Sequence, residues 1–232
     1  MRFRDRPAVV SGSTTTALPL RLPSTLAIFP LEGALLLPHG QLPLHIFEPR
    51  YRNMIEDALG NERMLGMIQP RSSYPHPLPD WAELFETGCA GRIVSFAETE
   101  DGRFLVTLKG ICRFRVVEEL PQEQGFRRIV PDFAPFRGDL EPASEEGIDR
   151  ARLLLAARAF LAMKSIDCDW PAAEQASVQA LVTSLAMSCP FEPGEKQALL
   201  ESGDLADRCK LLISLFEMTT LASESPPGGT RH

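Results

Sequence analysis

The histidines are the side chains of this 232-residue sequence best suited to binding a metal ion. His39, His45 and Glu48 place three potential ligands within ten residues. Zinc sites usually use a helical His-x-x-x-His pair or a Cys/His finger, and neither spacing occurs here. Ligands must also converge on one point with supporting contacts around them. We therefore interpret the histidines as structural, and we predict no metal site and no cofactor.

Catalysis by hydrolysis would require signatures that are missing from this sequence. No lysine follows a glycine-rich loop able to cradle phosphate, and Lys109-Gly110 has the reverse order. No serine lies in a Gly-x-Ser-x-Gly elbow, although a Ser–Lys dyad can assemble from distant residues. The acidic run around Glu98 and Asp101 is typical of a solvated hairpin tip. We predict no catalytic residues, with a cryptic hydrolase as the alternative.

The charge and cysteine patterns limit the classes of partner. A net charge of −7 disfavours nucleic acid, whose phosphates require a basic surface. No apolar run reaches the ~18 residues of a membrane helix, so no membrane association is expected. The five cysteines are scattered, odd in number and without a Cys-x-x-Cys pair. Such a set is typical of reduced thiols packed as small apolar residues in a cytoplasmic protein.

Short apolar runs bounded by proline and glycine dominate the first half and predict strands. One amphipathic helix interrupts them, from Pro49 to Gly60, with an apolar stripe that begins at Tyr51. Asp101-Gly102 predicts a tight hairpin turn. The predicted strands are 26–29, 35–37, 41–47, 64–68, 88–97, 103–109, 111–118 and 126–133.

After Pro142 the apolar period changes to that of helices. Ser144 is predicted to cap the first helix, Pro171 and Pro193 to open the next two, and Asp204 to cap the last. This order predicts an α+β fold. We divide the chain into a mobile arm (1–23), a β-rich domain (24–137), a helical bundle (143–222) and a disordered tail (223–232).

The segment from Leu42 to Phe47 has features of a peptide-binding edge. Proline removes a ladder hydrogen bond, so Pro43 predicts an edge strand. An apolar edge can accept an extended peptide as an added strand. The alternative is that Leu44, Ile46 and Tyr51 form core and that Pro43 only prevents unwanted pairing.

Several short motifs, taken together in order, resemble the N-terminal substrate-binding domain of the Lon protease. They cover about residues 24–222 and are most similar to the stand-alone bacterial branch. The residues that carry the resemblance are Phe29, Pro30, Pro38, Glu48, Pro49, Arg50, Tyr51, Gly88, Gly91, Gly102, Gly110 and Arg113.

The resemblance implies a β-rich PUA-like pseudo-barrel with one helix, followed by an α-helical bundle. It also implies a non-catalytic module for unfolded or extended polypeptide, acting as an adaptor or client-holding protein in proteolysis. Lon itself or another protease is a candidate partner, and the ATPase and Ser–Lys protease domains of Lon have no counterpart here. The alternative is a small-molecule or RNA-binding PUA-like protein, and the acidic balance weighs against RNA.

We place the hypothetical peptide site on the edge segment and on a proline-rich loop that follows the helix. The loop, residues 71–81, is longer than the resemblance implies. Its aromatic side chains can bury large apolar area against a bound chain. The predicted binding residues are Leu42, Pro43, Leu44, Phe47, Tyr74 and Trp81.

Overall fold

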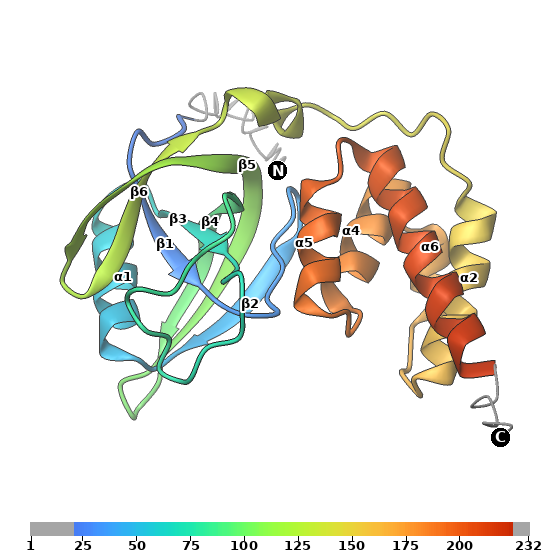
Figure 1. Cartoon of the computed structure of the whole chain (residues 1–232), viewed down its shortest axis with the longest axis horizontal. Coiled ribbons are helices and arrows are strands. Elements are labelled where there is room, and N and C mark those ends of the chain that lie inside the picture. Colours follow the sequence, from blue (N-terminus) through green and yellow to red (C-terminus); the bar gives the residue numbers. More distant parts are fainter. Residues whose placement is uncertain (1–20, 225–232) are drawn as a thin grey trace, which may run out of the picture.

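The structure is a computed structural model that describes residues 21–224. Most of the predicted arm and of the predicted tail therefore lie outside the described residues. The tail was predicted to begin at Ser223, but the last helix continues to Glu224. The chain forms a β-rich half and a helical half, side by side in Figure 1.

A six-stranded sheet curls into a barrel in the β-rich half (Figure 1). The strands are β1 (Leu26–Pro30), β2 (Gln41–Ile46), β3 (Met64–Ile68), β4 (Thr87–Glu98), β5 (Phe104–Glu123) and β6 (Phe126–Asp132). Their order is β2-β5-β4-β3-β1-β6, and β5 also pairs with β6, which closes the barrel. Among the described strands, only β1 and β3 are parallel neighbours. Within residues 21–224, strand β2 pairs with β5 alone, so one of its edges is open there, as Pro43 predicted.

One helix, α1 (Pro49–Gly60), packs against the barrel. Proline is tolerated at its first position because the missing N–H has no partner inside the helix. The predicted stripe is buried, with Tyr51 5% and Ile55 0% exposed. The barrel with one helix confirms the β-rich part of the expected fold.

The helical half follows a short 3-10 segment, η1 (Ala134–Leu140). Its helices are α2 (Arg150–Met163), α3 (Trp170–Gln175), α4 (Val178–Ser188), α5 (Pro193–Glu201) and α6 (Leu205–Glu224). Phe160, Phe191 and Phe216 form its centre, with ring centroids 4.8 to 5.6 Å apart. One cluster of buried apolar side chains runs from the barrel into this bundle. The α+β class is confirmed.

Two strand predictions were wrong. Residues 35–37 are buried but form no strand; they cross over Gly110 instead. A Cβ on Gly110 would lie 2.0 Å from the Leu37 carbonyl oxygen, so only glycine allows this approach. The two strands predicted on either side of Gly110 are in fact the single strand β5. Glycine weakens a strand pattern locally, whereas the pairing with β4 resumes on both sides of a register shift beside Gly110.

One helix start and the length of another helix also differ from the prediction. Helix α2 begins at Arg150, and its cap is Asp149 rather than Ser144. The helix predicted from Pro171 is divided, because Ala176 and Ser177 have extended backbone and Ser177 caps α4. The starts at Pro193 and after Asp204 are confirmed.

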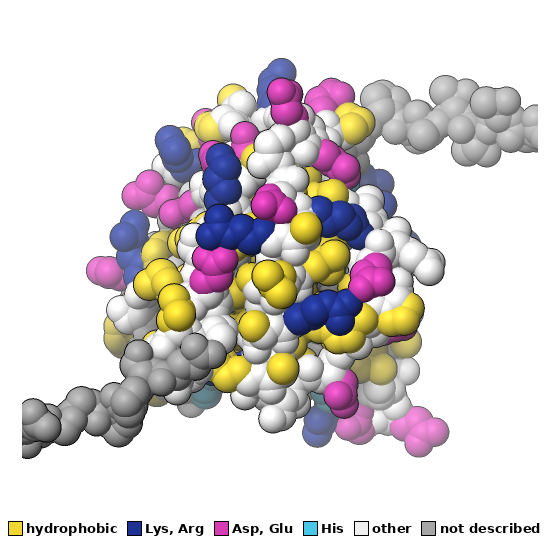
Figure 2. Space-filling model, turned by 90° about the vertical axis from the view of Figure 1, so that its right-hand side faces the viewer, with side chains coloured by type: hydrophobic (Ala, Val, Ile, Leu, Met, Phe, Trp, Pro, Cys, Tyr) yellow, Lys and Arg dark blue, Asp and Glu magenta, His cyan; other side chains and the backbone are white. Residues whose placement is uncertain are grey.

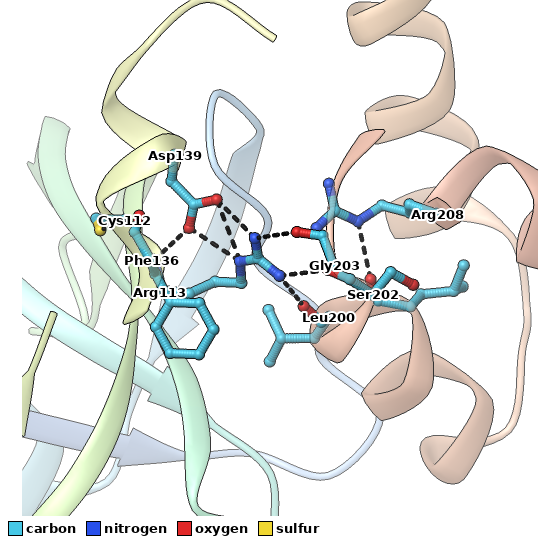
Figure 3. Close-up of polar contacts among 9 residues, drawn as sticks. Cys112, Arg113, Phe136, Asp139, Leu200, Ser202, Gly203 and Arg208 are labelled. Carbon is cyan, nitrogen blue, oxygen red and sulfur yellow. Dashed lines mark hydrogen bonds and ion pairs between the residues drawn. The ribbon is translucent and has the colours of Figure 1, made fainter. Parts of the chain in front are cut away.

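Buried polar contacts join the two halves, and Figure 3 shows their centre. Arg113 of β5 forms an ion pair with Asp139 of η1 at 2.8 Å. The same guanidinium donates to the carbonyls of Leu200, Ser202 and Gly203 at the end of α5. This arginine therefore links the barrel, η1 and the bundle at one point.

Candidate functional site

The open edge of β2 borders a groove of about 330 Å³, which we call the β2 groove. One wall is the segment from Pro43 to Glu48, and the second is the chain that continues from the end of β1, including Leu31. The third wall is the loop 69–86 between β3 and β4, through Tyr74, His76 and Leu78. Segments from three parts of the sequence thus enclose one concave surface.

Helix α1 holds the loop wall in place through Arg50. Its Nη1 donates to the Leu78 carbonyl at 2.9 Å and to Asp80 at 3.2 Å. Its Nε donates to Glu48 at 3.0 Å, which orients the guanidinium. The family-motif residues Glu48 and Arg50 therefore build the groove.

The loop also carries an aromatic pair. The rings of Tyr74 and Trp81 meet edge to face, with centroids 5.5 Å apart. The Tyr74 hydroxyl accepts a hydrogen bond from the Glu83 backbone N–H at 3.0 Å, and Ser73 hydrogen-bonds to Glu32 near β1. These contacts fix Tyr74 while Trp81 stays 73% exposed.

Alternation along β2 decides which predicted residues reach solvent. Leu44 is 9% exposed, so it is a core residue at the groove floor and presents little of its side chain to a ligand. Pro43 is exposed, and Phe47, just beyond β2, is 60% exposed. The exposure of Phe47 shows that it is not a core residue.

The structure brings most of the predicted binding residues together. Pro43, Leu44, Phe47 and Tyr74 all line the β2 groove. Trp81 lies outside the lining but contacts Tyr74. Leu42 is half-buried and does not line the groove.

Six lining residues were not among the predicted site residues: Leu31, Glu32, His45, Ile46, His76 and Leu78. His45 and Ile46 belong to the predicted edge segment. His76 and Leu78 belong to the proline-rich loop that the sequence had indicated as a wall. The two β1-end residues carried no local signal, because only the barrel brings them beside β2.

The groove floor is neutral and apolar. The ring centroids of Tyr51 and Phe29 are 4.3 Å apart. The Arg50 guanidinium lies over the Tyr51 ring, 4.6 Å from its centre. Burial raises the pKa of Tyr51 to about 12, so its phenol is uncharged at neutral pH. The surface is therefore suited to hold apolar side chains beside the backbone groups of an open strand edge.

The three described histidines do not all lie at one site. His39 lines a cleft between the two halves, whereas His45 and His76 both line the β2 groove. Within residues 21–224 no group of three or more His, Cys, Asp or Glu side chains could hold a metal ion. The same residues include no helix that is long and apolar enough to cross a membrane.

A second exposed apolar surface lies on the helical half. Leu155 of α2 and Met218 of α6 are 68% and 67% exposed. Figure 2 shows this side of the molecule, where apolar side chains are interspersed with both signs of charge. None of the predicted site residues lies there, which makes it a useful control surface.

Solved structures of similar shape define the class of the fold. The chain is similar to the Lon N-terminal domain protein from Xanthomonas campestris, with a TM-score of 0.54 and 22% identity, covering 88% of this chain and 100% of that one. It is also similar to the N-terminal domain of the Mycobacterium avium complex Lon protease, with a TM-score of 0.57 and 16% identity, covering 83% and 98%. The fold is that of Lon N-terminal domains.

Sequence relatives then define the family. Lon protease 2 of Myxococcus xanthus is 27% identical over 222 residues, and Lon protease 2 of Sorangium cellulosum is 28% identical over 192 residues. These alignments cover 88% and 81% of this chain but 26% and 24% of the relatives, so the chain spans about a quarter of their length. The chain belongs to the family of the ATP-dependent protease La (LON) substrate-binding domain, whose sequence model matches residues 25–217. The resemblance inferred from the motifs is confirmed.

Proposed function

We propose that this protein binds extended, partly unfolded polypeptide in the β2 groove and acts as an adaptor or client-holding module without catalysis of its own. One observation carries the proposal: an open strand edge, an apolar groove and two exposed aromatic side chains, Phe47 and Trp81, lie on the same part of the barrel. Membership of a substrate-binding family supports the same role.

Recognition would combine backbone and side-chain contacts. A bound segment would hydrogen-bond to open backbone groups of β2, except at Pro43, which has no N–H. Its apolar side chains would enter the groove above Leu44 and Tyr51, and would contact Phe47 at the end of the strand. Because backbone groups are common to all residues, such a site favours extended chains with apolar side chains over one defined sequence.

The test is the affinity for a fluorescent, permanently unfolded reporter protein. Losing a large aromatic contact at an interface costs about 2 kcal/mol, or roughly thirtyfold in Kd. We therefore expect Phe47→Ser and Trp81→Ala each to weaken binding by up to that factor. Their melting temperatures should stay near that of the wild type, because both side chains are largely exposed.

Leu155→Ser is the matched control, since it removes an equally exposed apolar side chain from the helical half. It should bind the reporter as the wild type does. If Phe47→Ser and Trp81→Ala fold normally and bind within twofold of the control, the β2 groove is not the site.

Catalysis and partnership are separate parts of the proposal. The matched family is the substrate-binding domain and not the catalytic domains of Lon. We expect purified protein to hydrolyse neither ATP nor casein, and to change the rate at which a full-length Lon or another protease degrades a bound client. Hydrolysis that is lost on one serine or lysine substitution would contradict the first expectation.

A further inference from the structure

A second cavity, separate from the β2 groove, lies between the two halves. It has a volume of about 590 Å³ and shares no lining residue with the groove. Arg113 of the barrel, the segment that follows η1, and the first residues of α6 border it. Arg208 of α6 also lines it.

Arg208 is unusual because its charge is buried without an anionic partner. It is 6% exposed, and its Nε donates to the Leu199 carbonyl at 2.8 Å. Its Nη2 is buried and has no hydrogen-bond partner. Within residues 21–224 no carboxylate forms an ion pair with this guanidinium.

Arg113, the neighbouring arginine, differs from Arg208 because its guanidinium is fully hydrogen-bonded. Arg113 binds both Asp139 oxygens and three carbonyls at the end of α5, so that carboxylate is already in use. Figure 3 shows the guanidinium end of Arg208 turned toward Arg113. The Asp139 carboxylate thus pairs with Arg113, and no ion pair to Arg208 is formed among the described residues.

The electrostatic consequence is a local excess of positive charge at the cavity floor. Burial, and then the charge of Arg113, lowers the pKa of Arg208 to about 10. The charges of Asp139 and Asp204 offset part of this effect. Burying a cation that has no ion-pair partner is costly, and a bound anion lowers that cost. The first residues of the 20-residue helix α6, Leu205 and Ala206, line the same cavity and add the positive end of a helix dipole.

One acidic residue of the cavity, Asp139, is paired with Arg113, and the others lie where solvent reaches them. Glu141 and Glu146 are exposed, and Asp204 is exposed and caps α6 by accepting from the Asp207 N–H at 2.8 Å. Thr183 and Gln179 of α4 offer neutral hydrogen-bond donors on the same wall. An acidic rim above a basic floor favours a small anion of low charge over a polyanion.

We propose that this cavity is an oxyanion site, in which Arg208 binds a carboxylate or a phosphate group between the two halves. Carboxylate and phosphate share the geometry that a guanidinium recognises. The group can come from the free carboxylate of a peptide or from inorganic phosphate. Because residues of both halves line the cavity, among them His39 of the β-rich half and Arg208 of the bundle, the bound anion also strengthens the joint between them.

The test titrates full-length protein at low ionic strength with inorganic phosphate, with acetyl-diglycine, and with its C-terminal amide. Calorimetry gives the Kd, and the melting temperature reports the effect on the joint. We expect at least one of the two anions to bind and to raise the melting temperature, while the amide does neither. Tighter binding of acetyl-diglycine identifies a peptide carboxylate as the source, and tighter binding of phosphate identifies the free ion.

Arg208→Gln should weaken binding by about tenfold or more, because a charge-assisted hydrogen bond is lost. Arg152→Gln is the charge-matched control, since Arg152 is exposed and paired with Glu217 on the outer surface; it should bind like the wild type. If Arg208→Gln does not fold, Thr183→Val provides the second variant and should weaken binding with the fold intact. The proposal is overturned if neither anion binds. It is also overturned if the Kd is unchanged in Arg208→Gln, or in Thr183→Val where Arg208→Gln does not fold.

Discussion

At the scale of single residues, burial determines the state of the cysteine thiols. Cys89, Cys112, Cys189 and Cys209 are buried, Cys168 is half-buried, and all five are free. Burial raises the pKa of Cys112 and Cys189 to about 12, and it also raises the pKa of Cys89. Since the thiolate is the reactive form, these three side chains are packing residues rather than nucleophiles.

The same shifts predict a loss of stability in alkali. An unfolded thiol releases its proton near pH 8.5, whereas the folded Cys112 and Cys189 hold theirs until about pH 12. The stabilisation is complete below pH 8.5 and is lost as the pH rises toward 12, at roughly 1.4 kcal/mol per pH unit for each thiol. Urea unfolding at pH 8, 9 and 10 should show the decline. Cys112→Ala/Cys189→Ala should show a shallower decline, and an equal slope in both proteins would contradict the account.

At the scale of elements, the start of α2 shows how one glycine overrides a plausible cap. Ser144 followed by two glutamates is a good helix start by composition. Gly147, however, has a φ of +76°, which turns the chain before a helix can form. Ser144 accepts a hydrogen bond from the Glu146 N–H in a local turn, whereas Asp149 accepts from the Arg152 N–H at 2.9 Å.

The two candidate caps can be compared directly. Asp149→Ala should lower the free energy of unfolding by about 1 kcal/mol, because an N–H of α2 loses its acceptor. Ser144→Ala should change it by less than about 0.5 kcal/mol, since Ser144 is exposed and outside the helix. Urea denaturation of both variants measures the difference. Equal losses would show that α2 begins earlier than Arg150.

At the scale of the whole molecule, the two halves behave as parts of one packed structure. A single cluster of buried apolar side chains extends from Phe29 in β1 to Phe216 in α6. Gln69 of the barrel donates to the Pro193 carbonyl, and Gln197 of α5 donates to the Thr87 carbonyl. The division into a β-rich domain (24–137) and a helical subdomain (143–222) stays a prediction.

Arg113 should be among the residues on which this joint depends most. Arg113→Met would leave the Asp139 carboxylate buried without its partner and the carbonyls at the end of α5 without their donor. Breaking one side of a buried ion pair costs about 3–5 kcal/mol. Arg152→Met, in an exposed pair with Glu217, should cost at most about 1 kcal/mol. Urea unfolding that gives equal losses for the two variants would show that the Arg113 contacts do not hold the halves together.

The sequence by itself determined most of the elements and the family. Local backbone preferences were enough to predict these elements. The local patterns are the period-two runs, the helix start at Pro49, the turn at Asp101-Gly102 and the proline in β2. The ordered motifs were also sufficient to indicate a Lon substrate-binding domain. The failures, at residues 35–37 and at Ser144, occurred where a packing contact or a turn outweighed a local preference.

Only the tertiary structure decided what the candidate sites look like. The burial of Leu44, the exposure of Phe47 and the third wall of the β2 groove depend on how the barrel closes. The pairing of Arg113 with the end of α5 and the unpaired charge of Arg208 depend on how the bundle docks. These contacts join residues as far as 90 positions apart in the sequence, as between Arg113 and Gly203. No local pattern encodes such contacts, because their free energy arises only when both partners are held in place by the packed core.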